Sequence, residues 1–467
     1  MVLGGLLAGA AAGWLVRSRD AEPVAPPEPP PAAAATAPRE APPVVAQDAP
    51  FVVLLIGCTM RWDQLTPYGG HRLATPTLQA LADDGARFTH AISAAPWTRA
   101  ASTALLTGHH PIEVGMIEPG PGANRRRLAD EVTTLAEHFA GAGYATIGTT
   151  ANPNLNEVFG FHQGFERYVE VTERWGKVGM VKVPGDEVVD GLLAAVDELP
   201  DDGRPRYLQA MLIDAHEPRT GSPRAVARMS DDGVPERVAM YRVNLRRFDK
   251  AVGRLLRGLE ARGVDDPLVM VVSDHGEGLV YPFHHGKGHG SFTYESAVRM
   301  PWLVRGPGVA RGHAIDGMAS QVDVLPTLLE LAGVGADGYA GPGKSWAAAI
   351  QGRADRTDRA VSFVDTWFQE ASRVAAYRTD VACHIDTVDR DADRRLRPTT
   401  ACYDRASDPR ADQPLPAPDD ALVRQATEWR AAQKARYEAY PHTADVAVRA
   451  ELAEQLEALG YVQDETP

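Results

Sequence analysis

The chain is poor in cysteine, in excess positive charge and in long apolar segments, and each shortage excludes a class of protein. Its 467 residues include only three cysteines, too few for a small disulfide-stabilised scaffold. The formal net charge of −14 argues against a nucleic-acid partner, because such proteins present a basic surface to phosphate. It leaves an anionic substrate possible, because a bound metal ion dominates the field close to it.

The N-terminus carries an apolar run that is too short to cross a bilayer comfortably. Residues 1–16 are uncharged and rich in Gly and Ala, and Arg17 and Arg19 follow them. About 20 apolar residues are needed to span the hydrocarbon core. We expect residues 1–20 to be a signal peptide or a membrane anchor, and the missing basic residues before the run favour the anchor, with its orientation left open.

Residues 21–49 are dominated by Pro and Ala and should form an extended, disordered linker. A short apolar start, a spacer and a folded domain together predict an extracytoplasmic protein, periplasmic or in the cell envelope, tethered by its N-terminus.

The folded part shows apolar runs that alternate with helical patterns. The runs at 51–57 (FVVLLIG), 207–213 (YLQAMLI) and 267–273 (PLVMVVS) are typical of strands buried on both faces of a parallel sheet. Helices are expected from Thr75, from Asp130 and over 241–262. The sequence therefore predicts a doubly wound, mainly parallel α/β domain over 50–338.

The C-terminal part, 339–467, should form a smaller α+β subdomain. The stretches SFVDTW, RVAAYRT and VACHID are typical of strands, and ALVRQATEWRAAQKARYEAY is typical of an amphipathic helix. Cys383 and Cys402 lie on either side of a charged turn. A hairpin would allow a disulfide between them, and two free buried thiols are equally compatible with the sequence.

Chemically reactive side chains follow the predicted strands, where ligands bind in such sheets. Cys58 follows the first run, Asp214 and His216 follow the second, and Asp274 and His275 follow the third. A carboxylate and an imidazole leaving one strand suit Zn, Mn or a similar divalent cation. A loop rich in His and Gly comes next, and its candidate residues are His285, Lys287 and His289.

Seven ordered segments carry a resemblance to a known family. They are, in order, VVLLIGCTMRWDQL, TPTLQALADDGARFTHAISAAPWT, LLTG, SDHGE followed by HGKGHG, RMPWLVRGPG, QVDVLPTLLELAG and CYDRASDPR. This order is similar to that of the sulfatase family of the alkaline-phosphatase superfamily, over nearly the whole chain from residue 51.

The resemblance implies an ester hydrolase with one divalent metal ion, Zn, Mn, Ca or Mg. It places Thr98 at the position of the nucleophile, which also ligates the metal, and it makes Cys58, Asp274 and His275 the other candidate ligands. His216, His285, Lys287 and His289 would contact the anionic oxygens of a small-molecule, glycan or lipid ester.

The chain departs from the family pattern at several of these positions. Thr98 is neither Cys nor Ser, so formylglycine is not expected. Ala100, Ala101 and Ser102 replace the family's Pro-Ser-Arg, and neighbouring Arg99 is the one candidate to replace the lost guanidinium. Cys58 stands where the family has Asp, and it could equally be a small buried apolar residue.

Three functions remain open at this point. The first is a sulfate or phosphate-type ester hydrolase that uses Thr98 and a metal tolerant of sulfur ligands. The second is a degenerate family member that binds or scaffolds without cleaving. The third is a membrane-tethered transferase of phospho groups, which usually carries several membrane spans before the catalytic domain.

Overall fold

The computed structural model describes residues 49–117, 126–171, 182–281, 287–354, 359–368, 371–390, 396–439 and 446–458. The predicted segment 1–20 and nearly all of the predicted linker 21–49 lie outside this part. Among the described residues, none of the helices has both the length and the apolar character that a membrane span requires.

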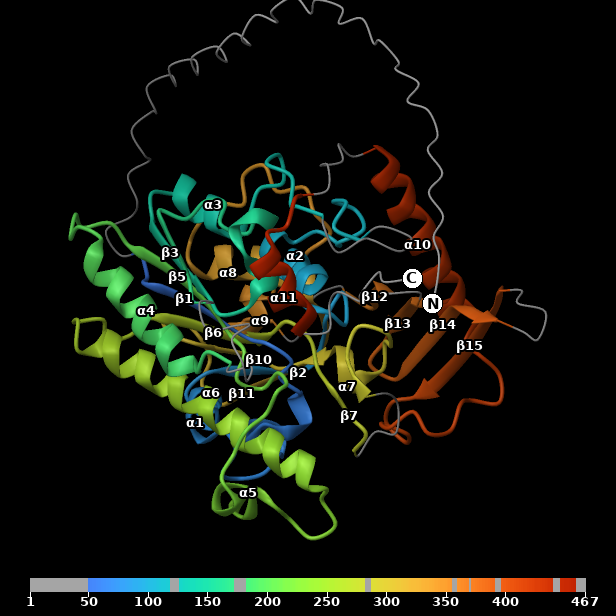
Figure 1. Ribbon diagram of the computed structural model, residues 1–467. Helices are drawn as coiled ribbons and strands as arrows, with labels where there is room; N and C mark the ends of the chain where they lie inside the picture. The colour runs from blue at the N-terminus through green and yellow to red at the C-terminus, as the bar shows by residue number, and fades with distance from the viewer. Residues whose placement is uncertain are drawn as a thin grey trace, which may run out of the picture. The chain divides into compact units, whose positions relative to one another are not determined.

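A large, mostly parallel sheet forms the centre of the protein (Figure 1). Every pairing along it is parallel except those of β10 and of the short β9 (Arg299–Met300), which pairs with β2. Its strand order is β11 (His313–Ser320), β2 (Ala86–Ile92), β10 (Trp302–Arg305), β6 (Leu268–Ser273), β1 (Val52–Gly57), β5 (Arg206–Leu212), β3 (Ala145–Thr150) and β4 (Arg167–Glu170). The predicted fold class is confirmed.

Helices cover both faces of this sheet (Figure 1). One group contains α1 (Pro76–Asp83), α4 (Gly185–Glu198) and α6 (Glu236–Glu260), with α5 (Pro223–Met229) against α6. The other contains α2 (Thr98–Thr107), α3 (Leu135–Gly141), α8 (Val324–Leu331) and α9 (Ala347–Ile350). The shorter elements are β7 (Gly278–Leu279), β8 (Lys287–Gly288), α7 (Glu295–Val298), α11 (Ala450–Ala458) and 3-10 helices at Trp62–Gln64, Thr66–Tyr68, Pro153–Leu155, Glu157–Phe159 and Gln321–Asp323.

The three predicted central strands are confirmed, and their apolar composition explains their place. Every residue of β1 and β6 is buried, as expected for strands covered by helices on both faces. Two helix starts were predicted wrongly. The helix expected from Asp130 begins at Leu135, because Thr134 and Glu137 form a capping box there, and α6 begins at Glu236, directly after Pro235, five residues before the predicted start.

A four-stranded antiparallel sheet follows near the C-terminus (Figure 1). Its strands are β12 (Ser362–Phe368), β13 (Ala371–Tyr377), β14 (Val381–Arg390) and β15 (Leu396–Asp404), and α10 (Asp420–Ala439) packs against it. The predicted strands and helix are therefore confirmed. The boundary between 338 and 339 stays a prediction, because the chain beyond Ala41 forms one compact unit.

Cys383 and Cys402 are directly paired across β14 and β15 and form a disulfide, which settles the open alternative between a bond and two free thiols. They are 19 residues apart in sequence.

Loss of this disulfide is expected to lower the free energy of unfolding by roughly 3 kcal/mol, because the bond restricts a loop of this length in the unfolded chain. The test is urea denaturation of the wild type and of the double variant Cys383→Ser/Cys402→Ser, each with and without reductant. Reductant should lower the urea concentration at the midpoint of unfolding for the wild type only. Equal midpoints for all four samples would contradict the prediction.

Candidate active site

The candidate site lies at the carboxyl ends of three neighbouring strands. Cys58 directly follows β1, Asp274 and His275 directly follow β6, and His216 follows β5. Because Gly57 pairs with Ser273 in parallel register, the residues after these two strands emerge side by side. Thr98, the first residue of α2, completes the group.

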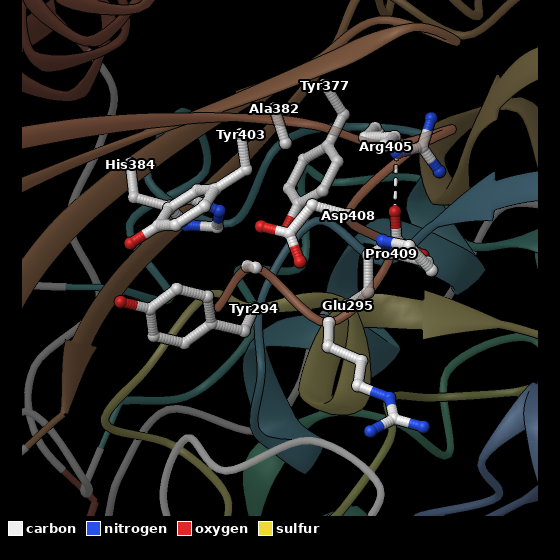
Figure 2. A pocket seen from close by; sticks show the side chains of 11 residues that line it. Tyr294, Glu295, Tyr377, Ala382, His384, Tyr403, Arg405, Asp408 and Pro409 are labelled. Atoms are coloured by element: carbon white, nitrogen blue, oxygen red, sulfur yellow. Dashed lines mark hydrogen bonds and ion pairs between the residues drawn. The ribbon is translucent and has the colours of Figure 1, made fainter. Parts of the chain in front are cut away.

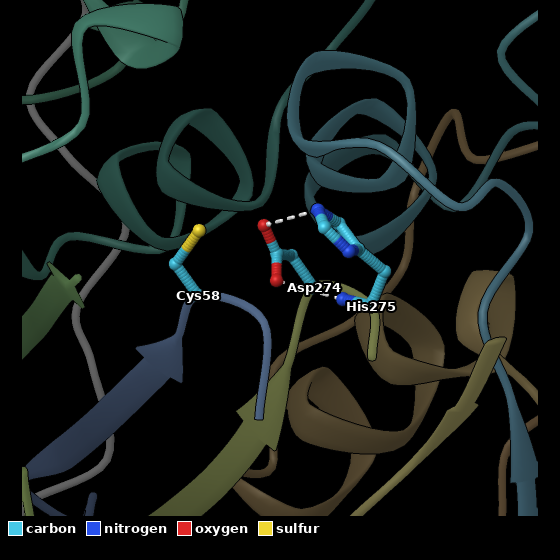
Figure 3. Close-up of side chains that lie close together, drawn as sticks. All are labelled: Cys58, Asp274 and His275. Atoms are coloured by element: carbon cyan, nitrogen blue, oxygen red, sulfur yellow. Dashed lines mark hydrogen bonds and ion pairs between the residues drawn. The ribbon is translucent and has the colours of Figure 1, made fainter. Parts of the chain in front are cut away.

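Three potential metal ligands converge at this point (Figure 3). Cys58 Sγ, a carboxylate oxygen of Asp274 and a ring nitrogen of His275 all lie within 4.8 Å of one another, and all three residues are fully buried. Asp274 Oδ1 accepts hydrogen bonds from the backbone N–H groups of Thr59 (2.9 Å) and His275 (2.7 Å). Asp274 Oδ2 is buried, lies 3.4 Å from His275 Nε2 and has no hydrogen-bond partner among the described residues.

The hydrogen bonds of His275 determine which ring nitrogen carries the proton. Nδ1 lies 2.8 Å from the carbonyl oxygen of Gly276, which can only accept, so Nδ1 is the donor. Burial lowers the pKa of His275 despite the neighbouring Asp274, so the ring is neutral and Nε2 carries a lone pair. The Thr98 hydroxyl, 3.3 Å away, can donate to that lone pair.

These residues fit a divalent cation. Asp274 Oδ2 and His275 Nε2 lie 3.4 Å apart in a buried place, and both atoms can act as ligands of a cation. A backbone carbonyl that fixes the ligating tautomer, as Gly276 does for His275, is the usual arrangement behind a metal-binding His.

Cys58 decides the kind of metal that this donor set prefers. Its Sγ lies 3.7 Å from Thr98 Oγ1 and accepts a hydrogen bond from Asn152 Nδ2 at 3.4 Å. Burial and the charge of Asp274 raise the pKa of the Cys58 thiol well above its usual range, so a bound cation would have to displace the proton. A thiolate binds Zn strongly and is a poor ligand for Mg or Ca.

Two further histidines line the same site. The ring centroid of His289 lies 4.7 Å from that of His275 and 5.1 Å from that of His216. His216 Nδ1 faces the carbonyl oxygen of Glu217, and its buried Nε2 has no hydrogen-bond partner among the described residues. His285 lies outside the described residues, and of Lys287 only the backbone, in β8, is described.

Glu277 and Arg219 are site residues that the sequence alone did not identify. Glu277 Oε1 lies 3.5 Å from His289 Nδ1, and Glu277 Oε2 accepts from Arg219 at 2.6 Å. Burial would raise the pKa of Glu277, but His289 and Arg219 together hold it well below its usual range. The ionised carboxylate can therefore fix the orientation of His289. Glu277 belongs to the SDHGE segment and Arg219 lies three residues after His216, but neither was predicted to be a site residue.

Lys182 was also missed. Its ammonium donates to the backbone carbonyls of Asp214 and His216. Burial lowers the pKa of Lys182 to about 7, against the opposing attraction of Asp214. The side chain thus tethers the loop that carries His216, and it comes from a stretch with no recognisable motif.

Arg99, the candidate replacement for the lost arginine, points its guanidinium over the ring of Phe159, 3.6 Å from its centroid. It also donates to Asn154 Oδ1 at 3.1 Å. Asn154 in turn bonds Asn152, which bonds Cys58, so a chain of two amides connects this guanidinium to the candidate ligands.

A small pocket elsewhere has a different character. It lies where β14 and β15 meet the segment at Tyr294, and the aromatic rings of Tyr294, Tyr377, His384 and Tyr403 come together there (Figure 2). The ring centroids of Tyr294 and His384 are 4.5 Å apart, and Arg405 is paired with Glu295. These contacts make it a packed junction between the C-terminal sheet and the main domain.

Comparison with known proteins identifies the family of this chain. The model of the family described as "Sulfatase" matches residues 50–334, more than half of the chain. The chain belongs to the sulfatase family. An ulvan-active sulfatase of Formosa agariphila is 24% identical over 331 residues, which are 61% of this sulfatase-family chain and 62% of that relative. Human arylsulfatase A is 26% identical over 385 residues, 71% of this chain and 73% of its own.

Solved structures show the same fold. The protein BT4656, in complex with its substrate D-glucosamine-2-N,6-O-disulfate, has a TM-score of 0.65 and 17% identity, covering 84% of this chain and 99% of its own. The phosphonate monoester hydrolase of Agrobacterium radiobacter has a TM-score of 0.63 and 18% identity, covering 83% of this chain and 96% of its own. The sulfatase-family chain thus spans about three fifths of the length of the ulvan-active sulfatase and most of these two structures.

Proposed function

We propose that this sulfatase-family protein is a metal-dependent hydrolase of sulfate or phosphate-type esters, with Thr98 as its nucleophile. The observation that carries the proposal is the buried group of Cys58, Asp274 and His275 with the Thr98 hydroxyl beside it. A metal ion held by these ligands would polarise the ester and neutralise its negative charge.

The chain's own side chains supply the remaining functions. Thr98 lies in the first turn of α2, where the helix N-terminus stabilises negative charge that develops on its oxygen. His289 is held by Glu277, and His216 Nε2 has no hydrogen-bond partner in the described part of the chain. Both histidines are therefore placed to bind the anionic oxygens or to protonate the leaving oxygen. His285 and Lys287 remain proposals from the sequence.

The names of the relatives support sulfated sugars as a substrate class. They include ulvan-active sulfatases, N-acetylgalactosamine-6-sulfatases and an enzyme bound to a disulfated glucosamine. Thr98 in place of a formylglycine precursor favours phosphorus esters instead, and the likeness to a phosphonate monoester hydrolase is compatible with this. We therefore propose small-molecule, glycan or lipid esters of either kind.

A second candidate is a degenerate family member that binds without cleaving. It is favoured by Ala100, Ala101 and Ser102 in the buried first turns of α2, where the family has Pro-Ser-Arg. Ser102 Oγ is itself buried without a hydrogen-bond partner among the described residues. Loss of a guanidinium near the nucleophile removes stabilisation of the transferring group. The membrane-tethered phospho transferase remains a third, less supported proposal.

We also infer an extracytoplasmic location, with attachment to the membrane through the N-terminal segment. The disulfide between Cys383 and Cys402 supports this, because such bonds persist mainly in oxidising compartments.

The test is an assay of the purified full chain on p-nitrophenyl sulfate, p-nitrophenyl phosphate and a p-nitrophenyl phosphonate ester, with Zn, Mn, Ca or Mg added singly. We expect release of p-nitrophenol that a chelator abolishes and Zn or Mn restores. A protein that binds the metal yet cleaves none of the three esters would overturn the hydrolase proposal and favour the degenerate alternative.

A further inference from the structure

Gly290, the residue after His289, is held between the C-terminal sheet and the loop that precedes Thr98. This loop, residues 93–97, is called the nucleophile loop below. The N–H of Gly290 donates to the carbonyl oxygen of Pro96 at 2.8 Å, and Pro96 lies two residues before Thr98. The carbonyl oxygen of Gly290 accepts from Thr366 Oγ1 at 2.6 Å, and both residues are buried. Gly290 thus connects three segments that are far apart in the sequence.

Thr366 belongs to β12, and this strand also touches the nucleophile loop directly. The backbone N–H of Asp365 donates to the carbonyl oxygen of Ala94 at 3.0 Å. Asp365 and Thr366 are adjacent in β12. Asp365 therefore bonds the nucleophile loop and Thr366 bonds Gly290, which are the two segments that the Gly290–Pro96 hydrogen bond joins. β12 thus fixes the position of the nucleophile loop relative to the segment that contains Gly290.

The far side of β12 is held by α10. Arg430 forms an ion pair with the buried Asp365 at 3.0 Å, and its guanidinium lies over the ring of Trp367, 4.5 Å from the centroid. The position of Thr366 is therefore fixed by neighbours in sequence that are themselves anchored. Because the strand is constrained in this way, the Thr366 hydroxyl can fix the position of Gly290.

We propose that Thr366 is a positioning residue of the active site, whose hydroxyl fixes Gly290 and so sets the ring of His289 relative to Thr98. Gly290 has a φ of +91°, a conformation that glycine tolerates and that the two hydrogen bonds on either side hold in place. The catalytic part of the proposal rests on the proposed hydrolase function, whereas the structural part, the orientation of His289, does not.

The experiment compares three variants of the full chain. Thr366→Val removes the hydroxyl at nearly constant volume, and Thr366→Ser restores it. Ser362→Ala is the matched control, because Ser362 is a buried hydroxyl residue of the same strand that donates at 3.1 Å to Ala319, away from the Gly290 loop. The readouts are kcat, KM and the imidazole 1H–15N signals of His289, assigned with a His289→Gln variant.

We expect Thr366→Val to lower kcat tenfold to a hundredfold with KM nearly unchanged, since a small misplacement of a catalytic group has effects of about this size. The imidazole signals of His289 should shift in Thr366→Val. Thr366→Ser should recover most of the wild-type kcat and signal positions. Ser362→Ala should have the kcat and the His289 signals of the wild type. If Thr366→Val does not fold, Thr366→Ala takes its place with the same expected pattern.

Two results would overturn the proposal. One is a Thr366→Val protein with wild-type kcat and unshifted His289 signals. The other is a loss of kcat and a shift of equal size in Ser362→Ala, which would indicate general loosening of the strand. If the wild type cleaves no ester, the His289 signals alone decide, and a selective shift in Thr366→Val keeps the positioning role while the hydrolase proposal fails.

Discussion

Replacing Thr98 with alanine is expected to lower kcat by on the order of 10⁴-fold or more, in line with the loss of other enzyme nucleophiles. The substitution removes the hydroxyl that we propose attacks the ester. It should leave the fold intact, because alanine is a good helix residue and the methyl and hydroxyl groups removed are small. Steady-state assays on the ester that proves best for the wild type measure the effect.

A neighbouring threonine provides the control for Thr98. Thr103 lies on the same helix, and its hydroxyl donates to the carbonyl oxygen of Arg99 at 2.8 Å, within the helix itself. Thr103→Ala should keep kcat within a few-fold of the wild type, and Thr98→Ser should keep measurable turnover. If Thr98→Ala and Thr103→Ala show the same kcat, Thr98 is not the nucleophile.

Asp274→Asn is expected to lower metal-dependent activity strongly and, at the same time, to stabilise the metal-free protein. The amide oxygen can keep the two backbone hydrogen bonds of Oδ1. In the wild type, Asp274 Oδ2 is an acceptor that lies 3.4 Å from the lone pair of His275 Nε2. In the variant, the amide nitrogen takes the place of Oδ2 and can donate a hydrogen bond to Nε2. Relief of such a buried mismatch is worth about 1–3 kcal/mol, whereas kcat should fall by roughly 10³-fold or more with the loss of an anionic ligand.

The measurement for Asp274 is urea denaturation in chelator, together with kcat in added metal. Asp249→Asn is the control, because Asp249 is an equally buried carboxylate whose bonds are with the N–H of Leu78 and with Arg246, and not with a candidate ligand. This control should lose stability and keep kcat. An Asp274→Asn protein that is less stable than the wild type in chelator would contradict the proposed mismatch.

The sequence predicted the centre of the fold because the signals there are local. Continuous apolar runs identified β1, β5 and β6, and the parallel register then brought Cys58 and Asp274 together without further information. The start of α3 was misplaced although its capping box, Thr134 and Glu137, was present in the sequence. The disulfide stayed open because spacing alone does not fix how two strands pair.

The rest of the site depends on contacts between segments that are distant in sequence. Lys182, Arg219 and Thr366 reach the site through bonds to backbone carbonyls or to a buried carboxylate. Neither periodicity nor residue type marks such a contact, because any donor of suitable length on the right element could make it. Only the arrangement of the elements in space identifies these residues.

The metal content of the purified full chain tests whether the active site holds a metal ion and whether a thiol is one of its ligands. Elemental analysis would compare the wild type, Asp274→Ala and Cys58→Ser, as purified and after separate exposure to Zn, Mn, Mg and Ca. We expect close to one metal ion per chain, with Zn retained in preference to Mg and Ca, loss of the ion in Asp274→Ala and weaker retention of Zn in Cys58→Ser. A wild-type protein that takes up none of the four metals, or that retains Zn equally well without Asp274, would contradict this expectation.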